Sequence, residues 1–175
     1  EKYGNDKPDL RENKNDPKEL AFAFVVNFPM FEWKDAEKRW DAVHHPFTMP
    51  QVKNRGEFLE LFKKDPSKIL AFQYDLVLNG YEIGGGSIRI HDGELLQAVF
   101  EAMGNKPEEV REKFGHMLEA FSYGVPPHGG IACGMDRFLA VALGEPNIRE
   151  IMAFPKTGDG RDLMTGAPAE AEPRQ

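Results

Sequence analysis

The chain is poor in cysteine, in long apolar runs and in basic charge, and each shortage excludes a class of protein. Cys133 is the only cysteine among 175 residues, so no disulfide framework forms within the chain. A lone cysteine is typical of a reducing compartment, and we therefore expect a cytoplasmic protein. No apolar run reaches membrane-spanning length and no signal peptide is visible, so we expect no membrane partner.

The acidic balance limits the partners that this segment can grip. The net charge is −7, with the acids spread along the chain, whereas a surface that holds nucleic acid is basic. Apolar residues make up 41% of the chain, which indicates a globular rather than a disordered protein. The length suits one good-sized domain. The chain begins at Glu1 without a methionine, and we expect a fragment or a processed form.

The stretch YDLVLNGYEIGGGSIRIH, residues 74–91, is the most informative part of the sequence. Its Asn79-Gly80 pair separates two strand-like runs, and both residues tolerate the positive φ of a type I′ hairpin turn. In such a hairpin Asp75 pairs with Gly84, and Asp75 shares a face with Glu82. Diagonal neighbours lie about 7–8 Å apart, so the two carboxylates are expected to hold one hard cation.

Three consecutive glycines, Gly84 to Gly86, interrupt the second run of this hairpin. Glycine inside a strand often marks a bulge or the close approach of a ligand. Strict alternation would point Arg89 away from the carboxylates, but one bulged residue reverses the phase. We predict such a bulge, which brings Arg89 to the face of Asp75 and Glu82. The alternative, a solvated outer sheet face, explains the alternating charges but not the glycines.

His44 and His45 stand side by side before Pro46, and an extended backbone would point them in opposite directions. Only one of them is then expected to face a given site. The alternative is that both histidines bond backbone groups at a strand end. Metal ligation is disfavoured because no third histidine or cysteine lies at ligand spacing.

A second candidate site follows a small-residue strand predicted over Ile131–Met135. Asp136-Arg137 opens an apolar helix that extends to Leu143 and ends at Gly144. The N-terminus of a helix attracts anions, and arginine adds a charge-assisted donor fork, so this segment suits a phosphate. The alternative is an arginine in a surface ion pair.

The remaining pattern predicts an α+β fold, an antiparallel β-sheet flanked by helices. Residues 1–19 read as a linker or loop, residues 20–166 as the domain and residues 167–175 as a flexible tail. The expected elements are a buried strand over Leu20–Phe28, a hairpin within Phe31–Val43, helices over Gly56–Lys64 (apolar stripe Phe58, Leu59, Phe62), Glu94–Met103 (capped by Asp92) and Pro107–Tyr123, and a strand over Ile148–Phe154. The helices over Glu94–Met103 and Pro107–Tyr123 are expected to pack on the sheet.

Several stretches together resemble the C-terminal part of the catalytic domain of a bacterial-type aspartyl-tRNA synthetase, a class II aminoacyl-tRNA synthetase. They cover most of Leu20–Pro168 in family order. The segment GIACGMDR resembles class II motif 3, and HHPFT with NGYEIGGGSIRIH points to the aspartate enzyme. The matching stretches are VVNFPMFEW, HHPFT, YDLVLNGYEIGGGSIRIH, FGHMLEAFSYGVPPHGGIACGMDR, IMAFPKT and LMTGAPA.

The resemblance implies ATP-dependent activation of L-aspartate to aspartyl-AMP and its transfer to tRNA(Asp) by a homodimeric full enzyme, with ATP and Mg²⁺ as cofactors. It assigns Glu82 and Arg137 to catalysis, and Asp75 with Glu82 to the metal. Aspartate would contact His44, His45, Ser87 and Arg89, with His44 facing the amino acid and Arg89 on its side-chain carboxylate. ATP would contact Glu82, Gly134, Met135, Asp136 and Arg137, with Arg137 on the γ-phosphate.

The sequence also departs from the family pattern. Motifs 1 and 2 and the anticodon-binding domain have no counterpart, and the segment ENKNDPKE stands where the family has an inserted domain. Asn27 replaces an expected aspartate. We therefore expect an incomplete enzyme that carries the motif 3 half of the active site. Two alternatives stay open: a non-catalytic synthetase-derived module that binds ATP or an amino acid, and an asparaginyl or asparagine-forming relative.

Overall fold

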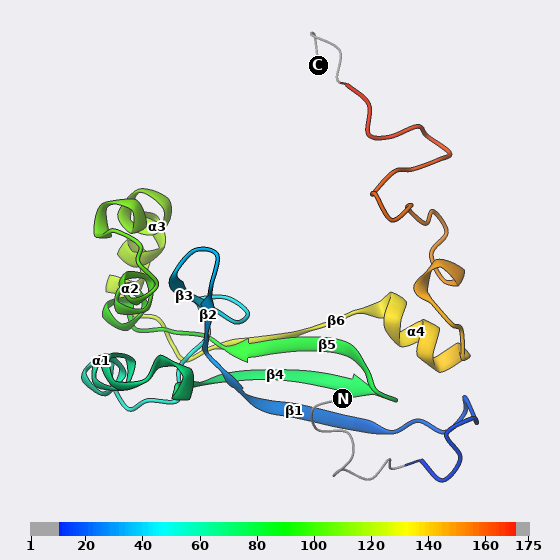
Figure 1. Ribbon diagram of the computed structural model, residues 1–175, viewed down its shortest axis with the longest axis horizontal. Helices are drawn as coiled ribbons and strands as arrows, with labels where there is room; N and C mark the ends of the chain where they lie inside the picture. Colours follow the sequence, from blue (N-terminus) through cyan, green and yellow to red (C-terminus); the bar gives the residue numbers. More distant parts are fainter. Residues whose placement is uncertain (1–10, 171–175) are drawn as a thin grey trace. The chain divides into compact units, whose positions relative to one another are not determined.

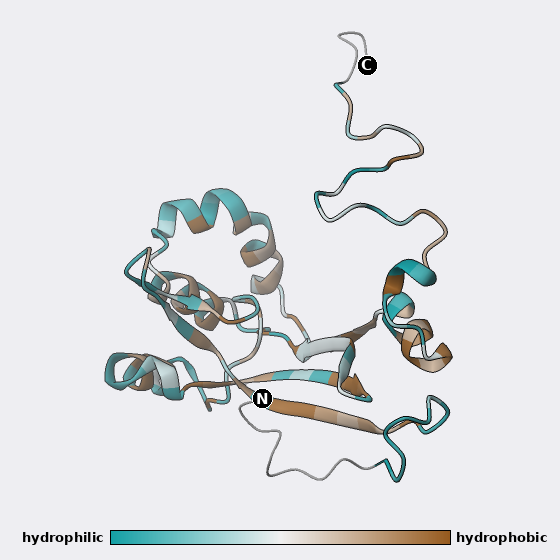
Figure 2. Cartoon of the chain, turned by 45° about the vertical axis from the view of Figure 1, so that its right-hand side comes forward, coloured by the Kyte–Doolittle hydropathy of each residue, from teal (hydrophilic) through white to brown (hydrophobic). Residues whose placement is uncertain are grey.

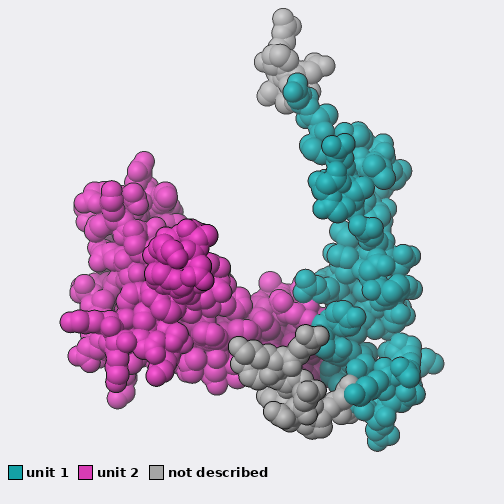
Figure 3. Space-filling model, viewed as in Figure 1, with its two compact units in different colours: residues 1–21, 78–81, 134–175 teal, residues 22–77, 82–133 magenta. Residues whose placement is uncertain are grey.

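The computed structural model describes residues 11–170 of the chain (Figure 1). These residues divide between two compact units, coloured separately in Figure 3. Unit 1 holds residues 11–21, 78–81 and 134–170 of the described part, and unit 2 holds residues 22–77 and 82–133. The predicted hairpin and its acids fall almost entirely in unit 2. The predicted domain boundaries stay a prediction.

A four-stranded antiparallel sheet runs through unit 2, in the order β1-β4-β5-β6. Strands β5 and β6 pair from Gly84 opposite Cys133 to Ile88 opposite Gly129. This sheet confirms the predicted α+β class. Its strands are β1 (Phe22–Pro29), β4 (Leu70–Leu78), β5 (Tyr81–Ile88) and β6 (Gly129–Cys133).

The turn between β4 and β5 has the predicted chemistry. Asn79 has φ 50° and Gly80 has φ 89°, the left-handed conformation that a two-residue hairpin turn requires. The Asn79 side chain does more than the sequence suggested. Its Oδ1 accepts from the amide of Ala21 at 2.8 Å, and its Nδ2 donates to the carbonyl of Glu19 at 3.1 Å. The turn therefore fixes the segment that leads into β1.

The apolar core of unit 2 lies among its helices and a small hairpin. Phe31 begins that hairpin and packs edge-on against Phe62 of α1, with ring centroids 5.2 Å apart. The core takes from the sheet region only residues at strand ends, such as Ile69, Ala71 and Ile90. The helices thus pack on one another and on strand ends rather than over a sheet face, so the prediction that the helices after Asp92 and after Lys106 pack on the sheet was wrong. These elements are β2 (Phe31–Lys34), β3 (Arg39–Ala42), α1 (Arg55–Lys64), the 3₁₀ turn η1 (Pro66–Lys68), α2 (Gly93–Ala102) and α3 (Pro107–Ser122).

Capping side chains set the starts of two helices. The Asn54 side chain accepts from the amide of Glu57 and begins α1. Asp92 accepts from the amides of Glu94 and Leu95 and begins α2, as the sequence predicted. The predicted apolar stripe of α3 also packs into the core.

Unit 1 contains one regular helix, α4 (Met135–Leu143), and the 3₁₀ turn η2 (Ile148–Glu150) within its described residues. Gly144, at φ 72°, ends α4. Residues 11–21 contain no helix or strand until β1 begins at Phe22. No helix in the described part of the chain is long and apolar enough to span a membrane.

Three local predictions were wrong. The first strand forms but is exposed, with Phe24 61% accessible, because β1 is an edge strand that the described residues leave uncovered (Figure 2, brown strand). On α1 the buried stripe is Phe58, Leu61 and Phe62, so Leu59 points outward. Residues 148–154 form η2 and irregular structure instead of a strand, because the Asn147 side chain accepts from the amide of Arg149.

Two further predictions concern segment ends. Strand β6 begins two residues earlier than expected, at Gly129, because Gly129 and Gly130 pair with Ile88 and Ser87. The predicted tail lies partly outside the described residues. Ala167 pairs with Asp162 in an isolated bridge, and residues 171–175 are not described. Residues 1–10 of the predicted linker also lie outside the described part.

The helical core predicts a contrast between two neighbours on α1. Phe58→Ala should lower the free energy of unfolding by about 3–5 kcal/mol, because Phe58 is fully buried and its removal leaves a cavity. Leu59→Ala should cost under about 1 kcal/mol, because Leu59 is 44% exposed. Urea unfolding followed by circular dichroism measures both, and equal losses would contradict this core.

Candidate active site

Two carboxylates converge over Gly85 in β5. A β-carbon built on Gly85 would lie 2.9 Å from Oδ1 of Asp75 and 3.4 Å from Oε1 of Glu82. Both acids therefore share one face of the hairpin, as the sequence predicted. Asp75 lies against Gly85 rather than Gly84, the partner expected without a bulge. The missing side chain gives the carboxylates their space, because a β-carbon at Gly85 would force the Asp75 carboxylate to shift.

The side-chain alternation of β5 reverses within the glycine run. Gly86 faces Tyr74, whose ring carbon would lie 2.8 Å from a β-carbon there, while Gly85 faces Asp75. With strict alternation Gly85 would lie on the face opposite Glu82. The observed orientation is the one expected from the predicted bulge. Continued alternation after Gly85 would put Ser87 and Arg89, which follow at intervals of two, on the face of the acids, and this placement stays a prediction.

Arg89 contacts one of the two predicted histidines. Its Nη1 lies 2.5 Å from Nε2 of His45, and Nδ1 of His45 lies 3.2 Å from Oγ1 of Thr48. Arginine only donates hydrogen bonds, so Nε2 accepts and the imidazole proton resides on Nδ1, facing Thr48. Residues 48 and 89 also pair in an isolated bridge. The contact sets the tautomer of His45 and orients the guanidinium.

The environment of His45 disfavours its protonated form. Burial lowers the pKa of His45 below its ordinary value near 6.5, and the positive charge of Arg89 and the neighbouring His44 lower it further. His44 is exposed and packs edge-on against Phe28, with ring centroids 4.9 Å apart. Only His45 therefore lies beside Arg89, and which histidine of the pair faces aspartate stays a prediction.

The segment around Thr48 wedges between the ends of β4 and β5. The amide of Met49 donates to the carbonyl of Ile88 at 2.8 Å, and the amide of Phe72 donates to the carbonyl of Met49 at 2.9 Å. Strands β4 and β5 thus separate at this end, and Thr48 is buried between them. The wedge carries His45 to Arg89, a position that residue spacing alone did not indicate.

The sequence reasoning missed one buried polar residue on this face, Gln73 of β4. It is 7% exposed, and its Nε2 lies 3.4 Å from Oδ1 of Asp75. Its spacing of two residues from Asp75 was the available signal, because alternate residues of a strand share a face. Ser87, a predicted site residue, is fully buried in β5.

The two carboxylates fit a magnesium ion that arrives with a nucleotide. Among the described residues no group of three or more histidines, cysteines or acids lies close enough to hold a metal by itself. Mg²⁺ usually binds through one or two carboxylates together with substrate phosphates. Asp75 and Glu82, both directed over the bare backbone of Gly85, supply such a pair.

The second predicted site lies in unit 1, where α4 begins. Gly134 is the N-cap residue and makes no side-chain cap, so the first turn presents backbone N–H groups. Asp136 and Arg137 stand in that first turn, and Met135 is exposed. The predicted strand–glycine–helix arrangement is therefore present, with the geometry that attracts a phosphate.

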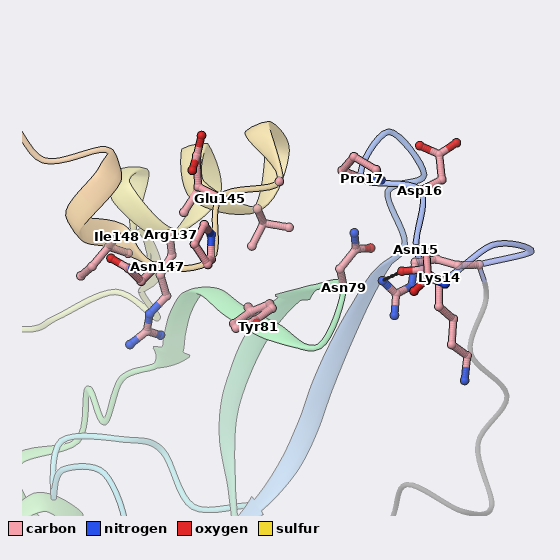
Figure 4. A pocket seen from close by; sticks show the side chains of 15 residues that line it. Lys14, Asn15, Asp16, Pro17, Asn79, Tyr81, Arg137, Glu145, Asn147 and Ile148 are labelled. Carbon is pink, nitrogen blue, oxygen red and sulfur yellow. Dashed lines mark hydrogen bonds between the residues drawn. The ribbon is translucent and has the colours of Figure 1, made fainter.

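A pocket of about 310 Å³ lies within unit 1 (Figure 4). Arg137 is its only member from the predicted site residues. Figure 4 shows the Arg137 side chain directed away from Lys14, which lines the other side. The place of Arg137 relative to Asp75, Glu82 and Arg89 stays a prediction.

Comparisons of the sequence point to one family of enzymes. Residues 1–158 match the family described as tRNA synthetases class II (D, K and N). The chain is 55% identical over 152 residues to an aspartate–tRNA(Asp/Asn) ligase of Thermotoga maritima, which covers 87% of this chain and 25% of the relative. It is 49% identical over 163 residues to the Dehalococcoides mccartyi ligase of the same name, covering 93% of this chain and 27% of the relative.

Solved structures show the same similarity at the level of the fold. The aspartyl-tRNA synthetase of Entamoeba histolytica aligns with a TM-score of 0.56 and 28% identity, over 79% of this chain and 23% of that one. The asparaginyl-tRNA synthetase of the same organism, in complex with asparaginyl-adenylate, aligns with a TM-score of 0.54 and 25% identity, over 81% and 26%. The chain thus spans about a quarter of the length of these relatives.

The Arg89–His45 contact predicts a pH effect. The lowered pKa of His45 means that the unfolded chain binds more protons below pH about 6.5, so this contribution to stability is complete above that pH and falls as the pH drops toward the folded pKa. Arg89→Met should raise the pKa of His45, because the variant lacks the positive charge that helps to lower it. NMR titration of the histidines measures the His45 pKa, with Arg55→Met on α1 as control. An unchanged His45 midpoint in Arg89→Met would contradict the contact.

Proposed function

The chain belongs to the class II tRNA synthetases of the aspartate, lysine and asparagine group, and we propose that the complete polypeptide carrying it is an aspartate–tRNA ligase. It would activate aspartate with ATP to aspartyl-AMP and pass the aminoacyl group to tRNA(Asp). Two observations in unit 2 carry this proposal: Asp75 and Glu82 meet over Gly85, and Arg89 is held by His45.

The arginine supports an acidic amino acid as substrate. A guanidinium binds a carboxylate through two parallel hydrogen bonds, and its planar fork does not fit the mixed donor and acceptor pattern of an amide equally well. Asparagine in the same place would leave a donor of the half-buried Arg89 mispaired. His45 contacts Nη1 from one side, which orients the remaining donors of Arg89 toward a ligand. His44, which packs on Phe28, would contact aspartate only after a rearrangement.

The acids and the start of α4 support ATP as the second substrate. Activation is attack of the amino-acid carboxylate on the α-phosphate, with pyrophosphate leaving, so catalysis depends on positioning and on stabilising phosphate charge. When bound, Mg²⁺ neutralises phosphate charge, and Asp75 and Glu82 would hold it. Arg137 and the backbone N–H groups after Gly134 would hold phosphate oxygens. The enzyme needs no covalent nucleophile, and Cys133 has no role in this scheme.

The exposed apolar strand β1 supports an incomplete unit. Phe22, Phe24, Val25 and Val26 are all more than 40% exposed, although large apolar side chains are usually covered. The chain spans about a quarter of its relatives. Further parts of the complete polypeptide would pack here and supply the missing half of the site, the tRNA contacts and the homodimer interface.

The proposed activity predicts amino-acid-dependent ATP–pyrophosphate exchange by the complete polypeptide. Aspartate should support exchange and asparagine should not. Arg89→Met should lower kcat/KM for aspartate on the order of 100-fold, because the carboxylate loses a charged hydrogen-bond partner. Arg55→Met, which alters an exposed arginine of α1, is the matched control and should change it less than twofold. Exchange that prefers asparagine would overturn the assignment.

The close contact at Gly85 predicts a second variant with reduced exchange activity. Gly85→Ala should lower exchange at least tenfold, because the new β-carbon would lie 2.9 Å from the Asp75 carboxylate and displace it. Gly115→Ala on α3 should leave exchange unchanged and add up to about 1 kcal/mol of stability, because its β-carbon meets only a side chain at 3.5 Å. A Gly85→Ala enzyme with full activity would exclude the proposed role of the carboxylate pair.

A further inference from the structure

Gln73 is a buried amide whose donor is used and whose acceptor is not. The side chain is 7% exposed, and its Nε2 lies 3.4 Å from Oδ1 of Asp75. Within the described residues its Oε1 makes no hydrogen bond, although it is buried. A buried polar atom without a partner costs free energy. A residue with only a packing role would avoid this cost with an apolar side chain of similar size.

The register of the hairpin places Ser87, whose hydroxyl oxygen also lacks a hydrogen-bond partner within the described residues, opposite Gln73. Asp75 lies against Gly85 and Tyr74 against Gly86, so antiparallel pairing brings Gln73 opposite Ser87. The bonds of Met49 to Phe72 and to Ile88 agree with this register. Ser87 is fully buried, and its Oγ also makes no hydrogen bond within the described residues. Two unsatisfied oxygens therefore belong to residues that this register puts opposite each other, and one of these residues, Gln73, contacts Asp75.

We propose that Gln73 is a positioning residue for Asp75, which rests on the function proposed above. The amide of Gln73 would hold Oδ1 of Asp75, the oxygen that lies over Gly85, and would thereby fix the carboxylate that is to bind a cation arriving with ATP. The amide also places a neutral donor beside two like charges, Asp75 and Glu82, which would otherwise repel each other over Gly85. The unsatisfied Oε1 and the Ser87 hydroxyl provide the contacts through which bound ligand or its water fixes this amide.

The pairing makes the role specific to metal-bound nucleotide. Gln73 contacts Asp75 but is itself buried. It therefore acts through the Asp75 carboxylate rather than on ATP directly. Loss of the amide should therefore weaken the part of ATP binding that depends on the cation. ATP binding without a divalent cation does not use Asp75 as a ligand and should not change.

The test compares ATP affinity with and without Mn²⁺ in the complete polypeptide, measured by isothermal titration calorimetry. Gln73→Met keeps the length of the side chain and removes the amide, and Gln73→Asn keeps an amide that is one methylene too short. Both should reduce the Mn²⁺-induced gain in ATP affinity about five- to tenfold. In exchange assays the KM for Mg·ATP should rise more than kcat falls.

The matched control is Gln97→Met on α2. Gln97 makes the same kind of bond, from its Nε2 to Oε1 of Glu101 at 2.7 Å, on the outer face of a helix. Its loss should leave the Mn²⁺-induced gain within twofold of the unmodified protein. Circular dichroism melting confirms that each variant is folded, and Gln73→Asn replaces Gln73→Met if the methionine variant does not fold.

The outcomes separate the two proposals. A Mn²⁺-induced gain that persists in both Gln73 variants, or that falls equally in Gln97→Met, overturns the positioning role and leaves the proposed function intact. An equal loss of ATP affinity with and without Mn²⁺ also overturns it, because that pattern indicates a purely structural effect. Absence of aspartate-dependent exchange in the unmodified polypeptide overturns the proposed function and the role of Gln73 with it.

Discussion

The close approach of neighbouring strands and side chains at Gly85 and Gly86 is the constraint on which the candidate site depends. A β-carbon at Gly86 would lie 2.0 Å from the carbonyl oxygen of Gly130, a separation that no side chain tolerates. Tyr74 uses the same closeness, since its hydroxyl donates to that carbonyl at 3.0 Å. On the other face the space over Gly85 admits the carboxylates. Gly86 thus allows the close approach of the Gly130 backbone, and Gly85 leaves room for the carboxylates of Asp75 and Glu82.

One segment links the apolar core of unit 2 to the polar contacts of the candidate site. The core is a cluster of aromatic and aliphatic side chains, in which Phe47 packs edge-on against both Phe100 and Phe114. Phe47 begins the wedge that ends at Pro50, so the same segment anchors in the core and delivers His45 to Arg89. Rigid packing behind the wedge gives the polar face a fixed support, as precise binding geometry requires.

The buried polar side chains are concentrated where β4 and β5 separate. Thr48, Gln73 and Ser87 are the buried polar residues of the described chain, and all three belong to the wedge or to the strands beside it. Buried polar groups destabilise a fold unless they are paired. Their clustering beside Asp75 and Arg89 is therefore a stronger sign of function than the charges alone, which alternate on many exposed sheets.

Local chemistry made much of the chain predictable. Asn79-Gly80 determined the hairpin turn through its positive φ angles, Asp92 determined the start of α2, and the apolar spacing of α3 determined its buried face. The glycine run and Arg89 predicted a change of phase, because alternation without one separates the guanidinium from the acids. These features depend on residues close in sequence, and family resemblance added the expected substrate.

What only the tertiary structure decided concerns residues far apart in the chain. Gly85 rather than Gly84 faces Asp75, His45 rather than His44 meets Arg89, and Gln73 is buried beside Asp75. Leu59 points outward and β1 is exposed, because burial depends on what the rest of the fold places nearby. A sequence pattern records which way a side chain points along its own element. Only the packing of separate elements determines what it meets there.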